Sequence, residues 1–167
     1  MVLLLWDKIW KDIDVSHAVR LALFHDLPEA LVWDIDAYAY EIKKYPERKI
    51  EKQKEERDAM GYLRDILSWE QGDEIFSYRE EYEAWLTKEA KFVKALDKIE
   101  TLHQFIDAGQ KDFEDEASDF LATYADKCVS NYPELNDILS ITKTKLKKTY
   151  KLWWLEWKDR YDIHWRN

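Results

Sequence analysis

The stretch LALFHDLPEALVWDID, residues 21–36, places His25 and Asp26 side by side directly after an apolar run and follows them with further acids. Small and apolar residues at helical spacing predict a helix over 16–26, with the pair at its partly buried end. Charged groups that leave water need partners. The stretch therefore predicts a helical protein with a charged site inside it.

The composition supports the same fold class. Three Gly and three Pro in 167 residues leave few of the turns that a sheet protein needs, and 46% hydrophobic residues argue for a folded core. We predict an all-α, single-domain helical bundle. Cys128 stands alone, which suits a reducing cytoplasm, and no apolar run is long enough to span a bilayer. A cytoplasmic protein without a membrane partner is expected.

Helices are predicted along most of the chain. In the helix over 16–26, Ser16 is the expected N-cap, and Pro28 is expected to end that helix and begin another. Residues 43–58 are highly charged and are predicted to form an exposed connection before an apolar-periodic segment from Met60. The other predicted helices cover 2–12, 74–86, 88–107, 113–130 and a last segment from 133 onward, with an internal break.

The acids after the His-Asp pair indicate a cation. Glu29 and Asp34 follow Asp26 within about two turns, and carboxylates gathered on one wall repel each other unless a cation lies between them. A histidine nitrogen with carboxylate oxygens suits Mn, Co, Fe or Zn. The competing interpretation is an exposed histidine beside an acid in the first turn of the next helix.

Two blocks resemble a known family. HDLPEALVWDI, residues 25–35, and EAKFVKALDKIETLHQF, residues 89–105, are similar to HD-domain phosphohydrolases, in the branch of small 5′-deoxynucleotidases. The resemblance covers about residues 2–108. It implies a metal-binding helical core over 1–108. Residues 109–167 would then be C-terminal helices of the same domain that pack on the core or form a homodimer surface.

The resemblance also implies roles for individual residues. The family holds one divalent cation, here Mn, Co, Fe or Mg, with two histidines and two aspartates. By position, His25, Asp26 and Asp97 would be three ligands, Glu29 would transfer a proton, and Asp34 would orient the attacking water. The first histidine of the family would fall upstream of Met1, and Trp33 replaces the usual glycine, which is expected to reshape the substrate pocket.

The other histidines are poor substitutes for the missing ligand. His17 precedes His25 by eight residues, about 12 Å along a helix axis, and His103 follows Asp97 by about 9 Å on the opposite side of its helix. His17 is therefore too far from His25 to share a metal with it, and His103 is expected to be a core or pocket-wall residue. Nothing in the sequence supports His164 in the tail as a ligand.

The resemblance implies an enzyme that removes phosphate from deoxynucleoside 5′-monophosphates. Arg20, Lys94 and Lys98 are candidate phosphate-binding residues, although solvated helix positions explain each of them as well. Two alternatives stay open. One is a non-catalytic HD-like protein that binds nucleotides or mediates an interaction. The other is a deoxynucleoside triphosphate hydrolase with the same ligands and different products.

The charge distribution separates the C-terminus from the rest. Residues 141–167 carry eight Lys and Arg against three Asp and Glu, a net charge of +5. Because the whole chain has a net charge of −9, the remaining residues carry −14. An acidic body disfavours general nucleic-acid binding. The C-terminal lysines and tryptophans could stack bases and bind phosphates. However, Leu146, Tyr150, Trp153, Trp157 and Tyr161 share helical spacing, which favours a core or dimer helix.

Overall fold

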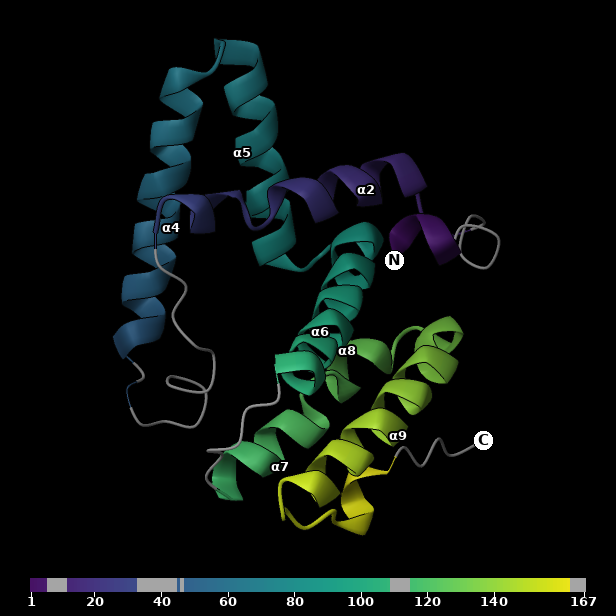
Figure 1. Ribbon diagram of the computed structural model, residues 1–167. Helices are drawn as coiled ribbons and strands as arrows, with labels where there is room; N and C mark the ends of the chain where they lie inside the picture. The colour runs from purple at the N-terminus through teal and green to yellow at the C-terminus, as the bar shows by residue number, and fades with distance from the viewer. Residues whose placement is uncertain (6–11, 33–44, 46, 109–114, 163–167) are drawn as a thin grey trace. The chain divides into compact units, whose positions relative to one another are not determined.

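The protein is described here by a computed structural model, in which residues 1–5, 12–32, 45, 47–108 and 115–162 are described (Figure 1). Within these ranges the secondary structure is helical and no strand occurs, so the predicted all-α class is confirmed. The chain divides into two compact units, Met1–Val93 and Lys94–Asn167. One helix, α6, begins in the first unit and ends in the second.

Among its described residues, the first unit contains two short 3-10 helices, three α-helices and the start of α6. Their bounds are η1 Val2–Leu5, α2 Val15–Phe24, η2 Leu27–Ala30, α4 Glu47–Ile66, α5 Trp69–Ala84 and α6 Lys88–Ala108. The predicted helix over 2–12 is wrong at both described ends, because residues 2–5 form a 3-10 turn and residues 12–14 are not helical. Residues 6–11 lie outside the described part.

Helix α2 begins one residue earlier than predicted. Asp14, not Ser16, is the N-cap, and its Oδ1 accepts the backbone N–H of His17 at 3.0 Å. A carboxylate satisfies this free N–H and also interacts favourably with the positive end of the helix dipole. Leu21 and Ala18 are fully buried on the inner face. As expected, the helix stops before Pro28, which is the second residue of η2.

Helices α4 and α5 form an antiparallel hairpin (Figure 1). The predicted exposed connection over 43–58 is wrong from Glu47 onward, because α4 starts there. The residues of its first half are strong helix formers, Glu, Lys, Arg and Gln, and pairs such as Lys52 with Glu56, 3.5 Å apart at i,i+4, stabilise a segment that has no apolar stripe. Helix α5 also starts earlier than predicted, at Trp69.

A glycine sets how closely the two helices of this hairpin approach. A Cβ on Gly72 would lie 2.5 Å from the backbone oxygen of Arg64 on α4, and backbone cannot move aside cheaply. By contrast, a Cβ on Gly61 would meet nothing within 4 Å.

These two glycines give a matched test. We expect Gly72→Ala to lower the free energy of unfolding by about 1–3 kcal/mol, since the helices must separate. Gly61→Ala should raise it by about 0.5–1 kcal/mol, because alanine is the better helix former. Urea titration followed by circular dichroism measures both. Equal effects of the two substitutions would contradict the close approach at Gly72.

The second unit contains the rest of α6 and the C-terminal helices. These are α7 Asp115–Thr123, α8 Asp126–Val129, η3 Pro133–Leu135, α9 Asn136–Leu152 and η4 Asp159–Tyr161. The prediction for α6 is confirmed to within one residue at its end, and Phe92, Leu96, Ile99 and Leu102 of the expected stripe are buried. The continuous helix predicted over 113–130 is wrong, because the chain turns at 124–125 between α7 and α8.

The aromatic C-terminal stripe is a core feature but not a single helix. Helix α9 ends in a Schellman motif: the N–H of Leu155 bonds the carbonyl of Tyr150 at 3.0 Å, and Trp154 takes the left-handed conformation, with φ 62°. The chain then folds back. The rings of Trp157 and Tyr161 pack edge-on against Tyr150, with centroids 5.2 and 6.4 Å away.

Candidate metal and substrate site

His25 lies at the C-terminal end of α2, with its side chain only 10% exposed. Its Nδ1 is 3.1 Å from the carbonyl oxygen of Ala22, one turn back on the same helix. A carbonyl only accepts hydrogen bonds, so Nδ1 carries the proton of this contact. The neutral ring then presents the lone pair of Nε2 on its other side. Metal-bound histidines are commonly held in this way, by a carbonyl on the second nitrogen.

The lone pair of Nε2 faces the carboxylate of Asp26. Its distance to Oδ2 is 3.0 Å, and the ring of Tyr82 packs on the imidazole at a centroid distance of 4.4 Å. Two acceptor atoms this close repel each other unless a positive charge lies with them, either a proton on Nε2 or a cation bound by both. The donor set, one imidazole nitrogen and one carboxylate oxygen, suits a divalent transition metal. The pair therefore fits the metal that the sequence predicts.

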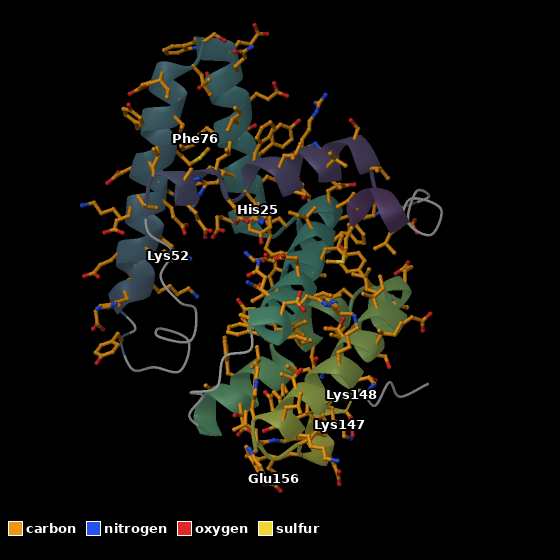
Figure 2. The ribbon with its side chains drawn as sticks, viewed as in Figure 1. His25, Lys52, Phe76, Lys147, Lys148 and Glu156 are labelled. Atoms are coloured by element: carbon orange, nitrogen blue, oxygen red, sulfur yellow. The ribbon has the colours of Figure 1, made fainter. Side chains whose placement is uncertain are left out.

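Glu29 belongs to a chain of alternating charges in the first unit. Its Oε1 is 3.6 Å from Nζ of Lys52, which is also 3.5 Å from Glu56. Glu56 in turn accepts a hydrogen bond from Arg79 at 2.7 Å, and the Arg79 side chain is only 3% exposed. Figure 2 labels His25 at the end of α2 and Lys52 on α4. The α4–α5 hairpin thus supplies a cation to the acid that follows the His-Asp pair.

This cation changes the chemistry expected of Glu29. The sequence predicted that Glu29 lies on a wall of mutually repelling carboxylates, but Glu29 is exposed at residue level and its ion-pair partner is an ammonium. The ammonium offsets the negative charge of the carboxylates around it. Lys52, Glu56 and Arg79 were not predicted as site residues. The i,i+4 spacing of Lys52 and Glu56 was visible in the sequence, but nothing there related it to Glu29.

Asp97 lies on the part of α6 that belongs to the second unit. It is half-buried, and one of its oxygens is 3.3 Å from Nζ of Lys98. That ammonium also donates to the hydroxyl of Tyr124 at 2.6 Å and lies over its ring. Burial opposes the charge of Lys98, but Asp97 and Tyr124 outweigh burial and raise its pKa. Lys98 is thus a cation that accompanies Asp97, and its role as a phosphate ligand stays a prediction.

The remaining predicted residues have separate surroundings. Arg20 donates to the hydroxyl of Tyr78 at 3.0 Å and lies 3.5 Å from Glu74, on the exposed side of α2. Lys94 is half-buried on α6. Asp34, Trp33 and His164 lie outside the described residues. The structure therefore brings His25 to Asp26 and Glu29 to Lys52, while the convergence of Asp97 with the pair stays a prediction.

His17 and His103 contact side chains of neighbouring helices. Nε2 of His17 is 2.8 Å from a carboxylate oxygen of Glu81, and its ring packs on Tyr78 at 5.2 Å. Nε2 of His103 is 3.0 Å from Oγ1 of Thr142 on α9. These contacts hold each ring within its own unit.

The family model described as HD domain matches residues 1–136. Because this is well over half of the chain, the protein belongs to the HD-domain family. Membership implies a divalent metal ion, in agreement with the donor set at the end of α2. Within the described residues, no helix is both long and apolar enough to cross a membrane.

Curated proteins with significant similarity include three called 5′-deoxynucleotidase HDDC2. The mouse (Mus musculus) protein is 34% identical over 142 residues, covering 83% of this chain and 64% of the relative. The human (Homo sapiens) protein is 36% identical over 140 residues, covering 80% and 60%. The Xenopus laevis protein is 38% identical over 97 residues, covering 58% and 45%. The chain thus spans less than two thirds of the length of each. No solved structure matches significantly.

Proposed function

We propose that this protein is a metal-dependent phosphohydrolase that removes phosphate from deoxynucleoside 5′-monophosphates. The observation that carries the proposal is the arrangement of His25, whose Nδ1 is held by a carbonyl while Nε2 faces the Asp26 carboxylate at 3.0 Å. The HD-domain match and the name shared by the curated relatives support the substrate class.

The proposed ligands are His25, Asp26 and Asp97. Helix α6 supports the inclusion of Asp97, because its first turn is anchored in the first unit, where Oε1 of Glu89 accepts the backbone N–H of Asp14 at 2.9 Å. Asp97 follows on the same helix, one turn beyond Val93. Mn, Co, Fe and Mg are all compatible with nitrogen and oxygen donors.

A bound divalent ion supplies polarisation of a phosphate oxygen and a lower pKa for water. The remaining chemistry belongs to side chains of this chain. Glu29, paired with Lys52, takes a proton from the attacking water and then passes it to the departing 5′-oxygen. Lys52 also holds the Glu29 carboxylate in place through its second contact with Glu56. Asp34 is proposed to orient the water.

The proposal is tested by purifying the protein, measuring bound metal by mass spectrometry, and assaying phosphate release from a panel of deoxynucleotides with added Mn or Co. Orthophosphate from monophosphates supports it. Release of triphosphate or pyrophosphate from deoxynucleoside triphosphates would instead favour a deoxynucleoside triphosphate hydrolase. A protein that binds no metal and releases no phosphate would favour a non-catalytic HD-like protein. Sedimentation of the same sample tests the proposed homodimer.

Glu29→Gln tests the proton-transfer role. We expect phosphate release to fall about 10²–10⁴-fold, since glutamine cannot carry the proton, while bound metal stays unchanged. Glu47→Gln is a matched control at an exposed position of α4 and should leave turnover unchanged. If Glu29→Gln retains full turnover, Glu29 has no part in the reaction.

A further inference from the structure

A surface pocket of about 500 Å³ lies at the C-terminal end of α9, entirely within the second unit. It contains none of the residues proposed for hydrolysis. Figure 2 labels Lys147 and Lys148 on α9 and Glu156 in the segment that follows. The lining residues are Lys147, Lys151, Trp154, Leu155, Glu156 and Trp157. The volume falls within the range of small-molecule sites, about 300–1,000 Å³.

Trp154 at this pocket is both strained and exposed. It occupies the left-handed position of the Schellman motif, where glycine is the favoured residue, yet the residue is 94% exposed. Trp85, the other non-glycine residue with positive φ in the described part, is half-buried. Packing in the core therefore does not explain why a tryptophan occupies this strained position at residue 154. A strained residue at a pocket is a reason to look for a ligand.

The polar groups of the pocket restrict the charge and the hydrogen-bonding groups of a ligand that could bind there. Nζ of Lys147 lies over the ring of Trp157 and 3.4 Å from Asp162, whereas Lys151 makes no ion pair with the residues that the structure describes. Two ammonium groups repel cations and attract an anion. The aromatic rings offer faces for a planar group. Glu156 can accept hydrogen bonds from ring N–H or amino groups.

We propose that this pocket binds a nucleoside phosphate, with the base stacked on Trp154 and the phosphate paired with Lys151 and Lys147. Glu156 accepts a hydrogen bond from the amino edge of the base. A free mononucleotide and one nucleotide of a single strand present the same chemistry. The site is separate from the proposed hydrolytic centre and does not depend on it.

The test is equilibrium binding of metal-free protein, in EDTA, to a mononucleotide and to a short single-stranded oligonucleotide by isothermal titration calorimetry. Trp154→Gly should weaken binding about tenfold or more, the effect of removing one stacked base. The same variant should unfold at an equal or higher temperature than the wild type, since glycine relieves the backbone strain. A merely structural tryptophan would instead lower the melting temperature when removed.

Matched variants complete the design. Trp69→Ala removes a tryptophan that is 81% exposed in the first unit, and Lys148→Met removes a lysine that neighbours the pocket without lining it. Both should bind like the wild type, whereas Lys151→Met should bind several-fold more weakly and less salt-dependently. Preference for the oligonucleotide would identify a strand as the source. No binding of either probe, or equal binding by Trp154→Gly and wild type, would overturn the proposal.

Discussion

Asp97→Ala is expected to remove the metal from the purified protein and to lower phosphate release at least about 100-fold. Replacing a single group that only orients a metal ligand already costs about 10–100-fold, so the loss of a ligand should cost more. His25→Ala should have the same effect, because the carbonyl of Ala22 holds its ring with Nε2 toward Asp26. Mass spectrometry of bound Mn or Co and a phosphate assay measure the two effects.

A control on the same helix separates ligation from damage to α6. Glu100 is exposed there and contacts Gln104, so Glu100→Ala removes one carboxylate without touching the proposed ligands. It should keep both metal and turnover. Full metal content in Asp97→Ala, with metal lost from His25→Ala, would show that Asp97 is not a ligand. Full metal content in both Asp97→Ala and His25→Ala would show that neither residue is a metal ligand.

Arg79→Met is expected to lower the free energy of unfolding by about 3 kcal/mol, the low end of the range for breaking a buried ion pair. Arg79 is 3% exposed, and the substitution would leave Glu56, itself largely buried, without the 2.7 Å contact. Lys52 would remain as a weaker partner of Glu56. Chemical denaturation gives the free energy.

Two further variants test the cause of this loss. Arg79→Met combined with Glu56→Leu should recover most of the stability, because no buried charge is then left unpaired. Arg57→Met breaks a solvent-exposed pair with Glu80 on the same hairpin and should cost at most about 1 kcal/mol. If Arg79→Met lowers the free energy of unfolding no more than Arg57→Met does, the buried pair stabilises the fold no more than the exposed pair.

Local sequence was sufficient for the elements with a strong apolar period. The bounds of α6 were predictable because Phe92, Leu96, Ile99 and Leu102 repeat at the helical period. It was insufficient for α4, whose charged residues have no apolar stripe at its start. At the C-terminus the helical spacing continued past Leu152, but the left-handed turn at Trp154 stopped the helix. Helical periodicity cannot show where a tertiary contact reverses the chain.

The amino-acid sequence alone determined the all-α class, the place of His25 and Asp26 at the end of a helix, and the acids that follow, because Pro28 and the apolar spacing act over a few residues. Only the tertiary structure decided that Lys52 reaches Glu29 and that Arg79 is buried against Glu56. Those partners are 23 residues apart along the chain. Their meeting depends on the packing of α4 against α5 and η2, which no local pattern specifies.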